Sequence, residues 1–246
     1  MVKYYCKYCN FRTIRENKLF EHNIKYHLND NDKNIKKIKD KNLTYLSILE
    51  LFNLKDNILK TTNIEGDIVE TGCGLGGSSI CMSLFKNPNK KLSIYDVFGT
   101  IPEPSEKDGK DVHKRYLEIK KGNAKGINGD KYYGYKENLL DEIKNSFKSF
   151  DIDINKSNII FIKGLYEDTL KLDSKISFAH IDCDWYESVD TSLKEIVPNL
   201  SKGGIITLDD YYAWSGCKLA TDNYFKDKKK YFKFEKKHNK LNIIKR

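Results

Sequence analysis

Two clusters of acidic residues in the second half of the chain could bind a metal ion. Residues 179–188 read AHIDCDWYES and include Asp182 and Asp184, and residues 205–211 read IITLDDY and include Asp209 and Asp210. Both clusters follow apolar, strand-like runs, and open α/β sheets bind ligands beyond the carboxyl ends of their strands. Four carboxylates in one crevice repel one another unless a cation is bound, and oxygen ligands favour magnesium. A turn or helix-cap role accounts for Asp184 or Asp210 taken alone, but not for all four.

A glycine-rich segment earlier in the chain has the pattern of a cofactor-binding loop. Residues 68–79 read IVETGCGLGGSS, so the turn follows an apolar strand and precedes a helix. Glycines permit a tight turn and let the backbone approach a ligand at the helix N-terminus. Such loops also bind nicotinamide and flavin cofactors, but an acid before the first glycine favours S-adenosylmethionine. An acid about 20 residues past the loop binds ribose hydroxyls, with a turn residue as the alternative. The residues predicted to bind the cofactor are Glu70, Gly72, Gly74, Gly76, Ser78 and Asp96.

The N-terminal residues carry four candidate zinc ligands. Cys6, Cys9, His22 and His27 form a C-x2-C-x12-H-x4-H pattern, which is the spacing of a tetrahedral structural zinc site. A block this short cannot fold on hydrophobic burial alone, so zinc would supply its stability. The block resembles the two-cysteine, two-histidine zinc fingers, although Thr13 stands where an aromatic residue is usual. One finger reads about three base pairs, which favours docking or localisation over nucleic-acid binding, and chance spacing is the other alternative.

Apolar runs alternate with helical patterns, which predicts an α/β fold with a doubly wound, mostly parallel sheet. The predicted strands are 67–70, 91–97, 158–163, 176–182 and 204–208, and the predicted helices are 78–85, 137–150, 166–170 and 186–200. Apolar positions between residues 46 and 54 predict one more helix. The C-terminal residues YFKFEKKHNKLNIIKR predict an antiparallel hairpin. Such a hairpin closes the seven-stranded sheet of the Rossmann-like class I methyltransferase fold and is missing from dinucleotide dehydrogenases.

The chain divides into three regions on composition. Residues 1–28 form the predicted ββα zinc finger, and residues 42–246 form the predicted methyltransferase domain. Between them, residues 29–41 read NDNDKNIKKIKDK, which indicates a linker or the solvated start of a helix. Residues 99–135 are charged and dotted with glycine, so we expect either a mobile lid or an ordered insertion there.

Composition indicates an intracellular protein without a membrane segment. The chain has 246 residues, six cysteines and a formal net charge of +9. The cysteines lack the spacing of a disulfide framework, and no apolar run reaches the roughly 20 residues needed to cross a bilayer. A signal peptide is also missing, so we expect a cytoplasmic protein. Only four of the 44 basic residues are arginine, and a lysine-coated surface of this kind is weak evidence for nucleic-acid binding.

The stretch from about residue 65 to residue 225 resembles the macrocin O-methyltransferase family of sugar-modifying enzymes. Six ordered segments carry the resemblance: VETGCGLGGSS, YDVFGTIPEPSEKDG, KGLYEDTL, HIDCDWYES, LSKGGIITLDDY and WSGCKLATDNYF. The resemblance implies that Asp182, Asp209 and Asp210 bind magnesium and that Asp184 is the general base. It also implies cofactor contacts for Glu70, Gly72 and Asp96. The chain departs from the family at residues 99–100, where Gly-Thr replaces Glu-Gly, and in having the zinc finger.

The expected function is magnesium-dependent methyl transfer from S-adenosylmethionine to a hydroxyl of a sugar or a glycosylated small molecule. His180 is a weaker candidate base than Asp184, because its place in the strand pattern FAHID favours packing or support. Nucleic-acid methylation, or a nucleic-acid-associated role through the finger, is the alternative. Against it, the chain lacks the Asn/Asp-Pro-Pro-aromatic tetrapeptide of amino-methylating enzymes. An aromatic diol is also a compatible acceptor. The complete set of acidic residues disfavours a binding protein with an inactive domain. A homo-oligomer is compatible with the sequence.

Overall fold

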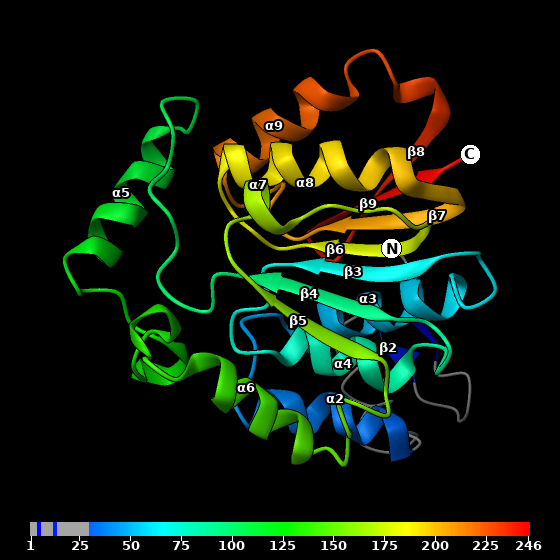
Figure 1. The fold of residues 1–246 in the computed structure, drawn as a ribbon, viewed down its shortest axis with the longest axis horizontal. Helices are drawn as coiled ribbons and strands as arrows, with labels where there is room; N and C mark the ends of the chain where they lie inside the picture. Colours follow the sequence, from blue (N-terminus) through cyan, green and yellow to red (C-terminus); the bar gives the residue numbers. More distant parts are fainter. Residues whose placement is uncertain (1–3, 6–11, 14–29) are drawn as a thin grey trace.

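The computed structural model describes residues 4–5, 12–13 and 30–246 of the chain (Figure 1). Two short strands, β1 (Tyr4–Tyr5) and β2 (Arg12–Thr13), pair in antiparallel fashion. The zinc ligands expected at Cys6, Cys9, His22 and His27 lie outside the described residues. The zinc finger and its role therefore stay predictions.

A seven-stranded sheet forms the centre of the fold, and Figure 1 shows helices covering both of its faces. Its strands are β3 (Asp67–Thr71), β4 (Leu92–Asp96), β5 (Ile159–Lys163), β6 (Ile176–Ile181), β7 (Leu200–Leu208), β8 (Phe232–Lys237) and β9 (Lys240–Lys245). They lie in the order β5-β4-β3-β6-β7-β9-β8. The first five pair in parallel, and β9 pairs antiparallel with both β7 and β8. The predicted fold and its C-terminal hairpin are thus confirmed.

Each face of the sheet has its own hydrophobic core. Below the sheet in Figure 1 lie α2 (Asp30–Asp40), α3 (Ile48–Lys60), α4 (Gly77–Phe85) and α6 (Leu139–Lys148). Above it lie α8 (Tyr186–Asn199) and α9 (Ser215–Phe225), with the single-turn α7 (Tyr166–Thr169) beside them. Because β3 and β6 are central and covered on both faces, their residues are almost all buried, which explains their continuous apolar patterns. Among the described helices, none is both long and apolar enough to cross a membrane.

Residues 30–40 form helix α2, which agrees with the helix and not the linker of the two alternatives considered for this segment. The polar composition of this segment hides two isoleucines, Ile35 and Ile38, that stand three residues apart and are both fully buried. Residues at this spacing lie on one face of a helix, so this face joins the core while Lys33 and Lys36 stay exposed. The core of the catalytic unit therefore includes residues before the boundary predicted at residue 42.

Residues 99–135 form an insertion beyond the sheet that contains the helix α5 (Lys110–Lys120). Two 3-10 turns follow it, η1 (Ile127–Gly129) and η2 (Tyr133–Tyr135), and Figure 1 shows α5 standing to the left of the sheet. Only Val112 and Ile119 of α5 are buried, which is why its sequence gave no helical signal. Helix α9 was likewise not predicted, since small and polar residues interrupt its apolar face.

Candidate functional site

The glycine-rich loop connects β3 to α4 and brings backbone close to the acidic residues. Gly72, Gly74 and Gly76 all have positive φ angles, of 86°, 51° and 86°. A side chain at Gly72 would place its Cβ 1.8 Å from the carbonyl oxygen of Asp182, whereas a Cβ at Gly74 would meet no atom within 4 Å. Gly72 is therefore required by close packing between two strand ends, and Gly74 faces open space.

Asp96 ends β4 beside this loop. Its carboxylate accepts hydrogen bonds from the Cys73 N–H at 2.8 Å and the Phe98 N–H at 2.7 Å. Burial raises the pKa of Asp96, and these backbone donors act in the opposite direction. Asp96 also lines the first cavity, so its carboxylate faces the space in which a further donor would lie. Asp96 can thus accept hydroxyl hydrogen bonds from a ligand at this strand end, as its spacing from the loop predicts.

Two cavities meet at the carboxyl ends of the parallel strands. The first has a volume of about 170 Å³ and is lined by Gly72, Asp96, Tyr166 and the insertion. The second has a volume of about 360 Å³ and is lined by Tyr45, Ser78, Arg115, Asp209, Asp210, Trp214 and Lys240. Gly74, Asp182 and Asp184 line both cavities. The predicted loop and the predicted acids therefore share one boundary, as expected for ligands of an open α/β sheet.

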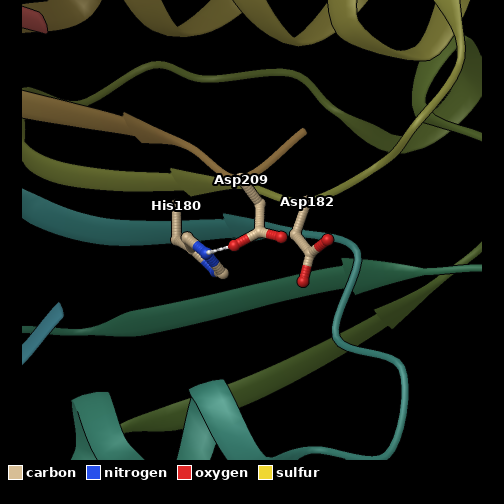
Figure 2. Close-up of side chains that lie close together, drawn as sticks. All are labelled: His180, Asp182 and Asp209. Atoms are coloured by element: carbon tan, nitrogen blue, oxygen red, sulfur yellow. Dashed lines mark ion pairs between the residues drawn. The ribbon is translucent and has the colours of Figure 1, made fainter. Parts of the chain in front are cut away.

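Asp182 follows β6 and Asp209 follows β7, which is the neighbouring strand. Figure 2 shows their carboxylates and the His180 imidazole pointing toward one another, and one donor atom from each lies within 4.8 Å of the other two. Burial raises the pKa of Asp182 well above its ordinary value, and the facing charges of Asp209 and Asp210 raise it further. A bound cation would relieve this repulsion.

The negative charge of the Asp209 carboxylate is balanced by two basic side chains. Its Oδ2 accepts a hydrogen bond of 2.7 Å from Lys240 Nζ, and its Oδ1 lies 3.6 Å from His180 Nε2. Burial acts to raise the pKa of Asp209, but His180 and Lys240 outweigh it and hold the pKa below the ordinary value. Lys240 also lies 3.3 Å from Glu50 Oε1. Sequence reasoning missed Lys240, because a lysine in the turn KKHNK carries no signal of burial at a strand edge.

Asp184 and Asp210 occupy different places from the other two acids. Asp184 has a positive φ of 58°, and its backbone N–H donates to Asp210 Oδ2 at 3.2 Å. Burial raises the pKa of Asp184 to about 6, Asp209 adds to this rise, and Trp214 opposes it. Burial, Asp184 and Asp209 also raise the pKa of Asp210 well above its ordinary value. Asp210 is not among the three side chains whose donor atoms converge.

Glu70 lies behind the site and does not line either cavity. It is fully buried, and its carboxylate accepts hydrogen bonds from the Ser79 hydroxyl and lies 2.9 Å from His180 Nδ1 through Oε1. The parallel pairing of β3 with β6 places Glu70 directly opposite His180. Glu70 therefore supports His180, and the cofactor contact predicted for it stays a prediction. Gly76 is also removed from the cavities, since its Cβ position meets the Ile143 side chain.

Comparison with known proteins identifies the family. The sequence model of the macrocin O-methyltransferase family (TylF) matches residues 46–233. The chain belongs to this family. It is an S-adenosylmethionine-dependent O-methyltransferase. The matched residues include the glycine-rich loop and the acidic residues that line the two cavities.

Two curated relatives of this O-methyltransferase come from Streptomyces. Demethyldecarbamoylnovobiocin O-methyltransferase of Streptomyces niveus is 26% identical over 74% of this chain and 67% of its own length. The 8-demethyl-8-(2,3-dimethoxy-alpha-L-rhamnosyl)-tetracenomycin-C 4'-O-methyltransferase of Streptomyces olivaceus is 28% identical over 65% of this chain and 58% of its own length. The match thus spans about two thirds of one relative and less of the other. Among solved structures, the O-methyltransferase NovP has a TM-score of 0.68 at 23% identity, covering 82% of each chain, which supports the fold.

In this O-methyltransferase, hydrogen bonds join the insertion (residues 99–135) to α8 and α9, the two helices that follow the acidic residues. Asp108 Oδ1 accepts the Tyr186 N–H at the start of α8, at 2.8 Å. Asp111 Oδ2 accepts the Ser215 N–H at the start of α9, at 2.9 Å. Neither helix has a side-chain cap of its own, so the insertion supplies both caps from outside. Residues of the insertion thereby form part of the wall of both cavities.

Proposed function

We propose that this enzyme methylates a hydroxyl group of a sugar or a glycosylated small molecule with the help of a divalent cation such as magnesium. The observation that carries the proposal is the convergence of partly buried carboxylates at the boundary of the two cavities. Family membership supports O-methylation, and the name of the Streptomyces olivaceus relative specifies a rhamnosyl-bearing acceptor. The cavity boundary is the place where a methyl donor in one cavity would meet an acceptor in the other.

The first cavity is proposed to hold S-adenosylmethionine. Gly72 and Gly74 let backbone N–H groups approach the ligand, and Asp96 accepts hydrogen bonds from its ribose hydroxyls. Gly76 does not line the cavity, but its positive φ allows the turn into α4. Ser78 lines the second cavity. Glu70 supports the site from behind through His180.

A divalent cation fits the residues at the boundary. Asp209 Oδ1 is buried and has no hydrogen-bond partner among the described residues, and an oxygen left in this state is costly unless a ligand meets it. The carboxylate of Asp182 faces the same space. Asp182 and Asp209 would therefore hold the cation, and the family resemblance adds Asp210. When bound, S-adenosylmethionine supplies the methyl group, and the cation supplies a positive charge that lowers the pKa of the acceptor hydroxyl.

Asp184 is proposed to remove the hydroxyl proton. It lines both cavities, so its carboxylate can reach an acceptor that faces the first cavity from the second. The proton moves to the Asp184 carboxylate, and the acceptor oxygen then forms its new bond to the methyl carbon as the bond from sulfur to that carbon breaks. The walls hold both reactants in line, which contributes through orientation. Tyr45 and Trp214 give the second cavity aromatic faces against which the apolar face of a sugar ring packs.

The test is transfer of an isotopically labelled methyl group from S-adenosylmethionine to pools of nucleotide sugars and glycosides, followed by mass spectrometry. We expect labelled acceptor with magnesium present and none in EDTA. Asp182→Asn and Asp209→Asn should abolish transfer while sparing cofactor affinity in calorimetry, because the glycine loop and Asp96 bind the cofactor elsewhere. The exposed Asp227→Asn is the matched control and should behave as the unaltered enzyme. Full transfer by dialysed enzyme in EDTA would refute the role of the cation.

A further inference from the structure

We propose that Arg115 binds a phosphate group of the acceptor, so that the sugar methylated by this enzyme carries a phosphate, as a sugar 1-phosphate or a nucleotide sugar does. This inference rests on the proposed function, because it names the class of acceptor that enters the second cavity. It also gives the insertion (residues 99–135) a part in selecting that acceptor.

Arg115 lies on the inner face of α5, the helix of the insertion. The two buried residues of this helix, Val112 and Ile119, stand three residues before and four residues after Arg115. Residues at these spacings share one face of a helix, so Arg115 is turned toward the domain, where it lines the second cavity. The lysines of α5 are instead all exposed, namely Lys110, Lys114 and Lys120. A positive charge on the inner face therefore has a different role from the solvated lysines.

The choice of arginine at this position departs from the composition of the chain. Only four of the 44 basic residues are arginine, and Arg115 is the single arginine between residues 16 and 245. Lysine is a compact, strongly hydrated point charge, whereas a guanidinium presents a planar fork of N–H donors that matches the oxygens of a phosphate. An arginine facing a cavity in a chain this rich in lysine therefore indicates an oxyanion ligand.

The guanidinium of Arg115 is held in place by weak contacts that a ligand can supplement or displace. Its Nη1 donates a hydrogen bond of 2.8 Å to Oε2 of Glu118, whose side chain is 48% exposed and lies three residues further along the same helix. An exposed pair of this kind contributes at most about 1 kcal/mol, because water screens it. On another side, the guanidinium carbon lies 5.5 Å from the ring centroid of Tyr132, which is buried and restrains the guanidinium plane.

The charge of Arg115 is not balanced by a buried acid. The other basic side chain that lines the second cavity is Lys240, whose Nζ lies 2.7 Å from Asp209 Oδ2 and 3.3 Å from Glu50 Oε1, so two nearly buried carboxylates neutralise it. The first cavity has no basic residue in its described lining. Among the described residues that line either cavity, Arg115 is thus the cation that remains to attract an anion.

The charges of the second cavity would orient an acceptor that has a phosphate at one end. Asp182 and Asp184 line both cavities, whereas Arg115 and Tyr45 line only the second, so the cation and the carboxylates occupy different parts of its wall. The carboxylates repel a phosphate, and Arg115 attracts it, which leaves the neutral sugar hydroxyls to face the boundary. The ring of Tyr45 is 54% exposed, and it lies close enough to Arg115 for the positive charge to oppose the rise in the tyrosine pKa that burial causes. This ring offers an aromatic face to the group that carries the phosphate.

The decisive experiment is nuclear magnetic resonance of the full chain labelled with ¹⁵N-arginine. The four arginines give four Nε–H signals, and Arg115→Lys identifies the signal of Arg115 by its loss. The probes are glucose 1-phosphate, UDP-glucose and methyl glucoside, which has the same sugar without a phosphate. EDTA is present, so that no cation links a phosphate to the aspartates. Both phosphates should shift the Arg115 signal in a saturable way, and methyl glucoside should not. The signals of the other arginines should stay in place, namely Arg12, Arg15 and Arg246.

Variants test whether the shift reports binding by the side chain itself. Arg115→Gln should weaken the affinity for both phosphates, followed by ³¹P resonance, by about tenfold or more, because charge-assisted hydrogen bonds are lost. Arg115→Lys should give an intermediate affinity, since the charge remains without the fork of donors. Lys114→Gln is the matched control, because it removes the same charge from an exposed position on the same helix, and it should leave the affinity unchanged. In the labelled-methyl assay, Arg115→Gln should raise KM for a phosphate-bearing acceptor more than it lowers kcat.

The outcomes separate this inference from the proposed function. No shift of the Arg115 signal with either phosphate, or an equal shift with methyl glucoside, would overturn the inference. A stronger response to glucuronate than to both phosphates would overturn the phosphate assignment in favour of a carboxylate. Tighter binding of UDP-glucose than of glucose 1-phosphate would support a nucleotide sugar as the source of the phosphate, and the reverse order would support a sugar phosphate.

Methyl transfer is scored separately from binding. Transfer to a neutral glycoside that is unaffected by Arg115→Gln would overturn this inference and leave the proposed function standing. Phosphate binding that requires Arg115, without transfer to any acceptor, would instead refute the proposed function.

Discussion

Replacing Gly72 by alanine tests whether the cofactor loop and the acidic cluster are held together by direct backbone contact. At its φ of 86°, any other residue costs about 1–2 kcal/mol for the left-handed conformation alone. The new Cβ would also lie 1.8 Å from the Asp182 carbonyl oxygen, so the two strand ends must separate by about 1 Å. Overpacking of this kind costs about 1–3 kcal/mol more. We expect Gly72→Ala to destabilise the protein by about 2–5 kcal/mol.

Gly74→Ala is the matched control in the same loop. Its φ of 51° carries a similar conformational cost, but its Cβ would meet nothing within 4 Å. In urea unfolding followed by circular dichroism, Gly74→Ala should cost only about 1–2 kcal/mol. The midpoint of Gly72→Ala should lie lower than that of the control by about 1 M.

A second measurement follows the displacement of Asp182. The carbonyl that Gly72→Ala would push belongs to a proposed cation ligand, and a misplacement of about 1 Å at a catalytic group can cost about 100-fold in rate. Mg²⁺ affinity should therefore fall in Gly72→Ala and stay near the original value in Gly74→Ala. Equal destabilisation of the two variants, with equal Mg²⁺ affinity, would refute the argument that the two strand ends are in rigid contact.

Three further results are expected. Asp96→Ala should weaken S-adenosylmethionine binding in calorimetry by about tenfold or more, because a buried acceptor is removed, and an unchanged affinity would exclude Asp96 from the cofactor site. Asp184→Asn should retain Mg²⁺ but lower turnover by about 100-fold or more, and normal turnover would identify another base. Deleting residues 1–28 should remove about one zinc per chain and leave methyl transfer intact. Deleting residues 1–41 should instead destabilise the domain by about 4 kcal/mol or more, because two buried isoleucines of α2 are lost, and a stable product would contradict the packing of that helix.

Local patterns in the sequence were sufficient to predict the order of the strands and helices around the site. The apolar run of β3 followed by glycines, and the strands that end in Asp96, Asp182 and Asp209, could all be located from short segments. They could be located because strand burial and turn geometry impose residue types on contiguous residues. The shared crevice followed from a general property of parallel sheets, whose carboxyl ends lie on one side.

Helices whose stability depends on distant contacts were harder to predict from the sequence. Helix α2 has a largely polar sequence, and only its packing shows that Ile35 and Ile38 belong to the core. Helix α9 begins at Ser215, where its cap comes from Asp111 in the insertion. No local sequence feature reveals a cap supplied by residues about 100 positions away, and the tertiary fold alone creates it.

The sequence determined which residue types lie at the site, but the tertiary structure decided the role of each residue. The sequence named Glu70, Asp209 and Asp210 and assigned His180 a supporting place, without indicating which oxygen or nitrogen would be free. The pairing of β3 with β6 places Glu70 opposite His180, and the antiparallel β9 brings Lys240 to Asp209. Whether a polar side chain binds a ligand or supports a neighbour depends on which partners already occupy its donor and acceptor positions. In this fold those partners come from strands far apart in the chain, so only the assembled sheet decides the roles.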